Sequence, residues 1–409
     1  MNPPAAPLSF KEVLAIADVR RLVIAQLVSV FGDFLAIFAV LTVATYQFHA
    51  NAIEISYLLV SFMLPLGIIS PLAGVMVDRW NRKFTMIASD LLRALIALML
   101  VFATSLWHVY IIFFCLSVVS AFFVPAQSVV LRSRVPPNGL VASNALMSQA
   151  MQVTQIVTPA FAGWLVASLG AQFCYWLDVC SFLFSALMVM AVPAPQIAEG
   201  RKLSGIAAEM TAGLRFIFTH AALTFVITAM TVGMFAVRCF GGLLAVYSRD
   251  ILKAGPEAFG MLNSLIGIGM ILGTQVITRA AKNRSKPALV VFGLITGSVF
   301  IALLAATGNI PGATAGMLGL GFGVAFIFVP AQTLLQELTP MEMLGRVMST
   351  LMSSLALTQV IALLASGSAA EAIGIRNLYF ASAAILAVLG LLGYRSLARA
   401  EAAAQTTSA

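Results

Sequence analysis

The sequence predicts an all-α integral membrane protein with twelve transmembrane helices in two six-helix parallel repeats. Three observations carry this prediction. Hydrophobic residues make up 61% of the 409 residues and charged residues only 9%, whereas a soluble chain needs roughly 25% charged residues to cover its surface. Long intervals contain no Asp, Glu, Lys or Arg, and one five-residue motif occurs in both halves. The composition therefore excludes a soluble globular protein.

The charge-free intervals define the spans. A spanning helix needs about 20 residues, so the longest intervals must each hold two helices joined by a short turn. Turn signals at 105–108, 170–172 and 308–312 divide these intervals. The twelve predicted spans are residues 21–47, 54–77, 84–104, 109–131, 140–168, 172–192, 222–248, 256–278, 287–306, 312–337, 345–369 and 376–395.

The distribution of basic residues predicts the orientation. The N-terminal segment lacks the basic and apolar regions of a removable signal peptide. Of the 23 Lys and Arg residues, 18 fall on the side of the N-terminus and three fall on the other, namely Arg249, Lys253 and Arg376. Because Lys and Arg are retained in the cytoplasm, both termini are predicted to be cytoplasmic, in a cell inner membrane. The net charge of +8 is then explained by topology, and no nucleic-acid partner is expected.

A single long polar connection separates the halves. It begins with two prolines and a charged run, and apolar residues from Leu203 to Ile217 then recur at helical spacing, which predicts an amphipathic helix on the inner membrane surface. The predicted domains are a six-helix bundle over 1–192, a cytoplasmic linker over 193–221, and a second bundle with a short tail over 222–409.

The repeated motif supports this division. Phe-Val-Pro-Ala-Gln occurs at 123–127 in span four and at 328–332 in span ten, an offset of 205 residues. A second proline follows each copy, at Pro136 and Pro340. Parallel six-helix repeats are typical of transporters that bind their substrate between the halves, near the membrane midplane.

The sequence offers no enzyme site. His49, His108 and His220 lie at different helix ends and cannot readily converge with a nucleophile or a metal. No Gly-x4-Gly-Lys-Ser/Thr phosphate loop is present, so ATP-driven transport and cofactors are not expected. The cysteines lie inside apolar stretches without metal-ligand spacing and are interpreted as small buried hydrophobes; they are Cys115, Cys174, Cys180 and Cys239.

The loop after span two carries the most specific motif. It contains Gly74, Asp78, Arg79, Arg82 and Lys83 at the spacing Gly-x3-Asp-Arg-x2-Arg-Lys. A positively charged loop that only fixes topology is one interpretation. The spacing also resembles the signature between helices two and three of the major facilitator superfamily, and this resemblance implies a cytoplasmic latch that engages the other half in the outward-open state.

Further segments narrow the resemblance to the exporter branch that includes enterobactin and macrolide efflux proteins. These segments are residues 26–33, Asp90-Leu-Leu-Arg93, the Phe-x-Pro-Ala of span four with 140–145 after it, 213–216, and Gly345-Arg-Val347. Two features depart from related antiporters. Span four lacks their arginine-led motif, and span five has Thr158-Pro159 where Gly-Pro is usual. The branch implies proton-coupled export, which these motifs do not establish.

Charged residues inside spans are costly and mark functional positions by default. Asp33 lies about twelve residues into span one, near the midplane at 1.5 Å per residue. Because removal from water favours the neutral form of a carboxylic acid, Asp33 is the first candidate for proton coupling. The alternative is a permanently ionised Asp33 that pairs with Arg238 or Arg93, or that bonds to the backbone of a neighbouring helix.

The other intramembrane charges have less defined roles. Asp90 and Arg93 share a helix face and are expected to form a local pair near the inner surface. Asp178 lies in the outer part of span six. Arg238 lies just past the middle of span seven, where it could attract a substrate anion or serve as a counter-ion. Glu337 and Glu342 flank the inner end of span ten and are hypothesised to receive the latch bases when the inner side is closed.

The leading functional hypothesis is a secondary active, proton-coupled exporter of small amphiphilic molecules that works by alternating access as a monomer. One alternative is a facilitator-fold importer or lysolipid flippase. The other alternative is a membrane sensor that kept the fold but lost transport. Protons, a small-molecule substrate and the lipid bilayer are the expected partners, and no metal is expected.

Overall fold

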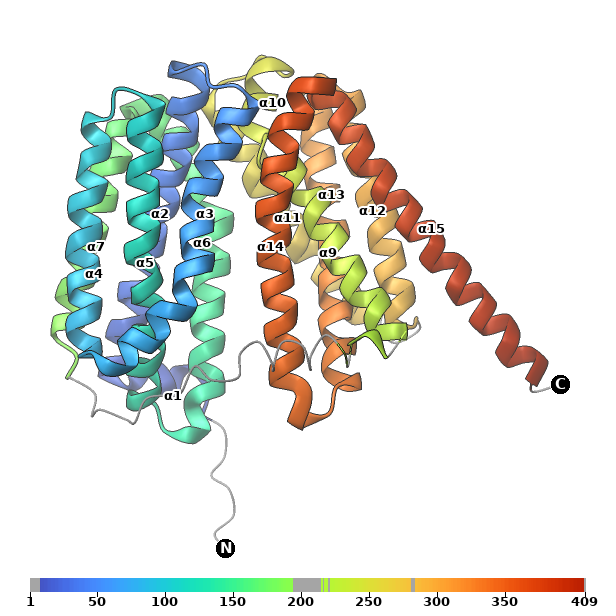
Figure 1. Ribbon diagram of the computed structural model, residues 1–409, viewed down its shortest axis with the longest axis horizontal. Helices are drawn as coiled ribbons and strands as arrows, with labels where there is room; N and C mark the ends of the chain where they lie inside the picture. Colours follow the sequence, from blue (N-terminus) through green and yellow to red (C-terminus); the bar gives the residue numbers. More distant parts are fainter. Residues whose placement is uncertain (1–7, 194–214, 216, 220, 281–283, 408–409) are drawn as a thin grey trace, which may run out of the picture. The chain divides into compact units, whose positions relative to one another are not determined.

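The computed structural model describes residues 8–193, 215, 217–219, 221–280 and 284–407, and in this part of the chain the regular structure is entirely helical. The first half forms seven α-helices, two of which continue into a short π-helical or 3-10 segment (Figure 1). Their bounds are α1 Phe10–Ala15, α2 Ala17–Thr42 with Val43–Gln47, α3 Ala52–Arg79, α4 Arg82–Leu98 with Met99–Phe102, α5 Leu106–Arg134, α6 Leu140–Leu169 and α7 Ala171–Met190; a separate 3-10 turn covers Pro137–Gly139.

The second half repeats this order. Its helices are α9 Ala221–Gly241, α10 Leu244–Asp250, α11 Pro256–Ala280, α12 Lys286–Ala306, α13 Ile310–Leu338, α14 Met341–Ile373 and α15 Ile375–Thr407. α9 and α10 together form one span that is interrupted at Gly242 and Leu243. Each of the twelve predicted spans is present, which confirms the predicted fold class. The predicted amphipathic linker helix lies outside the described residues.

Eleven helical segments of the described chain are long and apolar enough to cross a membrane. α6 is 30 residues long and extends about 45 Å at 1.5 Å per residue, but its amides lower its hydropathy. These amides are all exposed; they are Asn144, Gln149, Gln152 and Gln155. α6 is therefore the twelfth span, and it carries a polar side within the membrane.

The internal repeat has a period of 204 residues. Five helices of the first half begin exactly this far before their counterparts, since Ala17, Ala52, Arg82, Leu106 and Ala171 correspond to the first residues of α9, α11, α12, α13 and α15. The glycines before α7 and α15, Gly170 and Gly374, are also 204 residues apart and have φ values of +85° and +83°. Left-handed backbone of this kind favours glycine, so both halves turn the chain in the same way.

The repeated Phe-Val-Pro-Ala-Gln motif is one residue out of this register, because its copies are 205 residues apart. Phe123 is 2% exposed and corresponds in the helix to Ile327, which is also 2% exposed, while Phe328 is only partly buried. The motif therefore identified the correct pair of helices, α5 and α13, but not equivalent positions within them.

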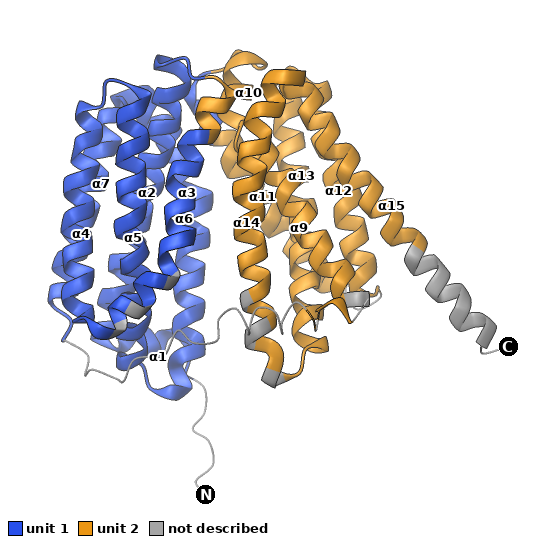
Figure 2. Ribbon diagram, viewed as in Figure 1, with its two compact units in different colours: residues 1–50, 57–203, 255–260 blue, residues 51–56, 204–254, 261–409 orange. Residues whose placement is uncertain are grey.

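The chain divides into two compact units, each built mainly from one half (Figure 2). Unit 1 comprises residues 1–50, 57–203 and 255–260, and unit 2 comprises 51–56, 204–254 and 261–409. In unit 1 the first turn of α11 packs on α6, where a Cβ added to Gly260 would lie 3.0 Å from the Cα of Gly163. Close approach of this kind requires small residues in both helices.

The four cysteines are free. Cys174 and Cys239 are buried, as predicted, and Cys115 is partly buried. Cys180 is exposed, which corrects the expectation that all four are buried: it lies on the outer face of α7, two residues after Asp178, and an apolar stretch does not distinguish an inner from an outer helix face.

Candidate functional site

Three helices of unit 1 bring four charged side chains together: Asp33 from α2, Asp90 and Arg93 from α4, and Asp178 from α7. All lie in the middle third of their spans. The sequence analysis expected Asp90 and Arg93 near the inner surface, whereas α4 and its 3-10 extension place them close to the centre of a 21-residue span. We refer to these four residues as the charge cluster.

Arg93 is the centre of the charge cluster. Its guanidinium forms a salt bridge with Asp90, one helical turn earlier. Its Nη1 atom lies 3.8 Å from Oδ2 of Asp33, so the structure gives Asp33 a partner in Arg93, one of the partners considered from the sequence. The Arg93 and Asp90 side chains are 4% and 0% exposed, and that of Asp33 is 27% exposed. Asp33 is thus the accessible member and the more loosely held carboxylate.

Neutral side chains fix the orientation of the pair. Ser185 of α7 donates a hydrogen bond of 2.7 Å to Oδ2 of Asp90. The guanidinium carbon of Arg93 lies 4.4 Å from the ring centre of Phe123 and 4.5 Å from that of Phe182. Cations are stabilised over aromatic faces when they are removed from water. Arg93 is therefore held by one close carboxylate and two rings, with Asp33 at the limit of ion-pair distance.

Asp178 closes the cluster from α7 and is 1% exposed. The Ser181 hydroxyl lies 2.7 Å from the main-chain oxygen of Asp178 and 3.4 Å from its Oδ1 atom. Gly32, the residue before Asp33, packs directly against this carboxyl, since a Cβ on Gly32 would lie 2.7 Å from Oδ1 of Asp178. The absence of a side chain at Gly32 thus lets α2 approach α7 and places Asp33 beside a second acid.

A second polar contact lies two turns away on the same face of α2. Gln26 accepts a hydrogen bond of 2.7 Å from Nε2 of Gln127 on α5. Gln127 is the last residue of the first repeated motif and is 8% exposed. Because residues seven apart lie on one helix face, Gln26 and Asp33 form a polar line along α2.

Arg238 belongs to unit 2 and lies three residues before the end of α9. Its Nε atom is buried and has no hydrogen-bond partner among the described residues. A buried polar atom without a partner is costly. Arg238 could therefore still bind an anionic group of the substrate or serve as the counter-ion of an acid.

The predicted latch lies at the junction of α3 and α4. Gly74 is within α3, Arg79 is its last residue and is exposed, and Arg82 begins α4 and is buried. Lys83 donates a hydrogen bond of 2.6 Å to the main-chain oxygen of Met190, at the end of α7. The side chain of Asp78 lies outside the described residues.

Of the predicted latch partners, Glu337 forms a salt bridge of 2.6 Å with Lys286 of its own unit. The side chain of Glu342 is not among those described. In this structure Lys83 and Glu337 thus each have a partner inside their own unit, so the proposed latch would require both to exchange partners.

The comparisons with known proteins agree with this architecture. The sequence profile of the Major Facilitator Superfamily matches residues 22–357. The chain belongs to the major facilitator superfamily. It is a multi-pass membrane transporter, and the predicted family is confirmed.

Its relatives include transporters named for efflux. The chain is 27% identical over 386 residues to the uncharacterized MFS-type transporter YfiS of Bacillus subtilis (strain 168), with 91% of each chain covered. It is 25% identical over 343 residues to macrolide efflux protein A of Streptococcus pyogenes, covering 80% of this chain and 84% of that one. Among solved structures, the nucleoside transporter NupG matches with a TM-score of 0.75 and 12% identity, covering 92% of this chain and 98% of that one. The last similarity concerns the fold alone.

Sequence reasoning found all four charged members of the cluster but not the groups that support them. Gly32, Ser181, Ser185 and Phe182 contact the charges from helices far apart in sequence. The signal available was weak: serine at 181 and 185 recurs at i, i+4 on an apolar helix that also contains Asp178, which places three polar groups on adjoining parts of one face.

Proposed function

We propose that this transporter exports small amphiphilic molecules by alternating access and that proton entry is coupled through Asp33. One observation supports the coupling most directly. Asp33 is the accessible carboxylate of a buried cluster in which three acids face a single guanidinium.

The charge count explains why such a site would take up a proton. With every group ionised, the charge cluster would carry a net charge of −2 in a region with little water. Charges removed from water are costly unless they are paired, and interacting acids share their protons as a group. Asp90 is already paired with Arg93 and Ser185. A proton on Asp33 would therefore relieve the excess charge at the most exposed carboxylate of the cluster.

Protonation would also release a contact between helices. The ionised Asp33 of α2 is attracted to Arg93 of α4 at 3.8 Å, where both helices pack on α7. The neutral acid loses most of that attraction, because the interaction depends on its charge. Two proton-dependent positions of α2 relative to α4 would follow. A substrate that prefers one position would then compete with the proton, as antiport requires.

The substrate class follows from the membrane-embedded surfaces. α6 exposes several amides beside apolar side chains such as Val153 and Val157, a mixture suited to amphiphiles. The similarity to macrolide efflux protein A supports export. We further propose that the protein acts as a monomer in the inner membrane with both termini in the cytoplasm, and that the loop at 78–83 engages Glu337 and Glu342 when the inner side closes.

The test is accumulation of dyes and toxicity of a chemical panel in an efflux-deficient bacterium. Cells would express wild type, Asp33→Asn, or the control Glu371→Gln, which alters an exposed acid of α14 outside the charge cluster. Wild type and the control should lower accumulation of some compounds, and Asp33→Asn at equal membrane level should not. Equal export by Asp33→Asn would contradict the coupling.

The alternatives make different predictions in the same cells. If wild type behaves like empty vector across the panel, export of this compound class is contradicted. Uptake of a defined nutrient or movement of a lysolipid would then support the importer or flippase alternative. If no class of compound were transported, the result would support the alternative of a membrane sensor without transport activity.

A further inference from the structure

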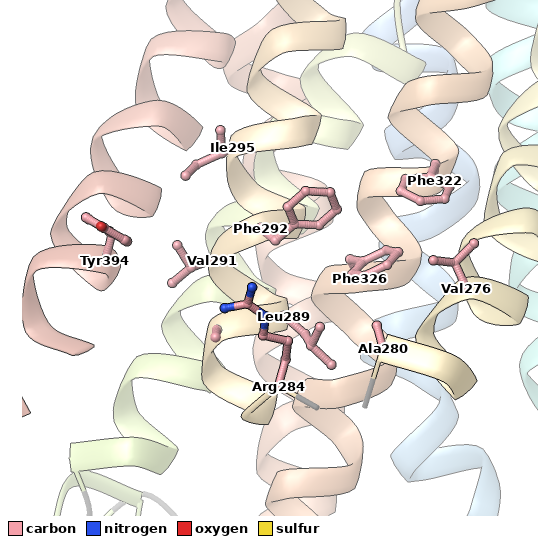
Figure 3. Close-up of a pocket in the computed structure, with 11 residues that line it drawn as sticks. Val276, Ala280, Arg284, Leu289, Val291, Phe292, Ile295, Phe322, Phe326 and Tyr394 are labelled. Atoms are coloured by element: carbon pink, nitrogen blue, oxygen red, sulfur yellow. The ribbon is translucent and has the colours of Figure 1, made fainter. Parts of the chain in front are cut away.

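Unit 2 contains a groove of about 670 Å³ on the side of the bundle, lined by residues of α11, α12, α13 and α15 (Figure 3). Phe292 and Ile295 of α12 are 49% and 38% exposed along it, and Tyr394 of α15 is 61% exposed. Cavities of roughly 300–1,000 Å³ accommodate ligands of drug size. The groove is separate from the charge cluster, which lies wholly in unit 1.

The floor of the groove is a set of packed aromatic rings. The ring centres of Phe292 and Phe326 lie 5.0 Å apart at 63°, and those of Phe322 and Phe326 lie 4.9 Å apart. Phe326 is 2% exposed. Aromatic pairs at these separations are favourable and well ordered, so the groove has a preformed apolar surface.

The groove has the depth of one membrane leaflet. It runs from Arg284, just before α12 begins, to Ile295 within α12. The ten helical residues from Lys286 to Ile295 extend about 15 Å, and half of the hydrocarbon core is about 15 Å. The connection between α11 and α12 is on the basic side that the sequence assigns to the cytoplasm, so the groove spans the cytoplasmic leaflet.

One basic side chain among the described residues lines the groove. Arg284 lines it, and its guanidinium points toward the apolar side chains of α12 (Figure 3). Two further exposed arginines adjoin lining residues in the sequence: Arg279 precedes Ala280 of α11, and Arg395 follows Tyr394 of α15. Lys286 is already paired with Glu337. Basic sites between transmembrane helices on the cytoplasmic side attract anionic lipid headgroups.

The first half offers a comparison for one position that lines the groove. Ala288 lines the groove and corresponds to Phe84 of α4, 204 residues earlier. Phe84 is a large side chain with 69% of its surface exposed. This helix position therefore accepts a phenyl ring, and one introduced at Ala288 would add bulk beside the groove.

We propose that this groove is a binding site for one anionic phospholipid of the cytoplasmic leaflet, with an acyl chain on the aromatic floor and the phosphate on Arg284. The charge at the entrance, the apolar lining and the leaflet depth all match such a lipid. A zwitterionic lipid has the same chains but lacks the net negative charge that Arg284 selects. The proposal concerns unit 2 alone and does not depend on proton coupling.

Native mass spectrometry of the full-length protein in detergent tests the proposal. The protein is given equal amounts of phosphatidylglycerol and phosphatidylcholine with identical acyl chains. Wild type should retain phosphatidylglycerol about fivefold more, the ratio expected for one basic side chain near a lipid headgroup. Arg284→Gln should remove this preference and Arg284→Lys should keep it. Arg132→Gln, a matched exposed arginine at the end of α5, should behave like wild type.

Ala288→Phe provides a second test, because it introduces the residue that α4 tolerates at Phe84. It should lower retention of both lipids at least tenfold while leaving the melting temperature unchanged. Equal binding of the two lipids by wild type would overturn the proposal and indicate a general apolar site. Unchanged preference in Arg284→Gln would also overturn it. If Arg284→Gln is unfolded, full retention of phosphatidylglycerol by Ala288→Phe would overturn it instead.

Discussion

Asp33, Asp90, Arg93 and Asp178 of the first half correspond, 204 residues later, to Val237, Leu294, Gly297 and Ser382 of the second. The burial of the two sets matches. Asp33 and Val237 are both partly buried, and the other members of both sets are buried. The same helix positions are therefore charged in one half and uncharged in the other.

The surroundings of Arg93 differ in the same way. Phe123 and Phe182 correspond to Ile327 and Leu386, which are apolar but offer no ring to a cation. The contact between α12 and α15 includes a hydrogen bond of 2.8 Å that Ser298 donates to the main-chain oxygen of Ala383. One half thus shows that this bundle can be built without intramembrane charges at these positions. The charges of the other half cost desolvation, which is consistent with the role in transport that we propose for them.

The largest expected effect comes from breaking the central ion pair. Arg93→Met should lower the free energy of unfolding by about 3–5 kcal/mol, because it leaves Asp90 buried without its cation. Asp90→Leu combined with Arg93→Met makes the pair apolar, with Leu as at position 294, and should recover part of the loss, because Asp33 and Asp178 still lack the cation. Thermal unfolding of the purified protein in detergent measures both. If the single variant is as stable as wild type, the pair is not buried as described.

Helix packing at Gly32 gives the next largest effect. Gly32→Ala introduces the residue found at the corresponding Ala236, but a Cβ there would lie 2.7 Å from Oδ1 of Asp178. We expect a loss of about 1–3 kcal/mol, typical of overpacking, and impaired transport. Gly67→Ala in α3 is the matched control, since no atom lies within 4 Å of its added Cβ. A Gly32→Ala variant as stable as this control would show that α2 and α7 can separate freely.

The proposed latch offers a comparison of the loop between α3 and α4 with the end of α13. Arg79→Glu should reduce transport about tenfold, which corresponds to about 1.4 kcal/mol, because it places an acid where the latch needs a base. Adding Glu337→Arg should restore much of the rate by exchanging the two charges. Transport assays in cells with equal membrane levels provide the measurement. Failure of the double variant to recover would count against Glu337 as the partner.

Lys83 gives the smallest expected effect. It donates to the end of α7, whereas the corresponding residue of the second half is Pro287. Lys83→Met should cost about 0.3–1 kcal/mol, the usual value for a cation at a helix C-terminus, and the cost should shrink in high salt. Lys11→Met, an exposed lysine of α1, is the control. Loss of the same stability in both variants would show that the Met190 contact is unimportant.

Sequence patterns predicted the helices well because hydropathy and charge mark where a chain enters and leaves a membrane. The predicted span at 256–278, for example, is α11, which covers Pro256–Ala280. Charge spacing also predicted that Asp90 and Arg93 would pair, because residues three apart share a helix face.

What the sequence could not supply was the rotation of one helix against another. Asp33 had two candidate side-chain partners, Arg93 and Arg238, and only the packing of α2 and α4 on α7 brings Arg93 to 3.8 Å. The same limit explains the motif offset, since a shift of one residue turns a side chain by about 100°. The groove beside Ala288 was also missed, because an open space depends on what neighbouring helices fail to fill.

The most direct test of the account is transport in inverted membrane vesicles with and without an imposed pH gradient. The vesicles would contain wild type, Asp33→Asn, or Val237→Ala, which alters the corresponding position of the second half. We predict that the gradient accelerates transport by wild type and Val237→Ala, and that Asp33→Asn transports at one slow rate whether or not the gradient is present. Gradient-driven transport by Asp33→Asn equal to that of wild type would contradict coupling through the charge cluster.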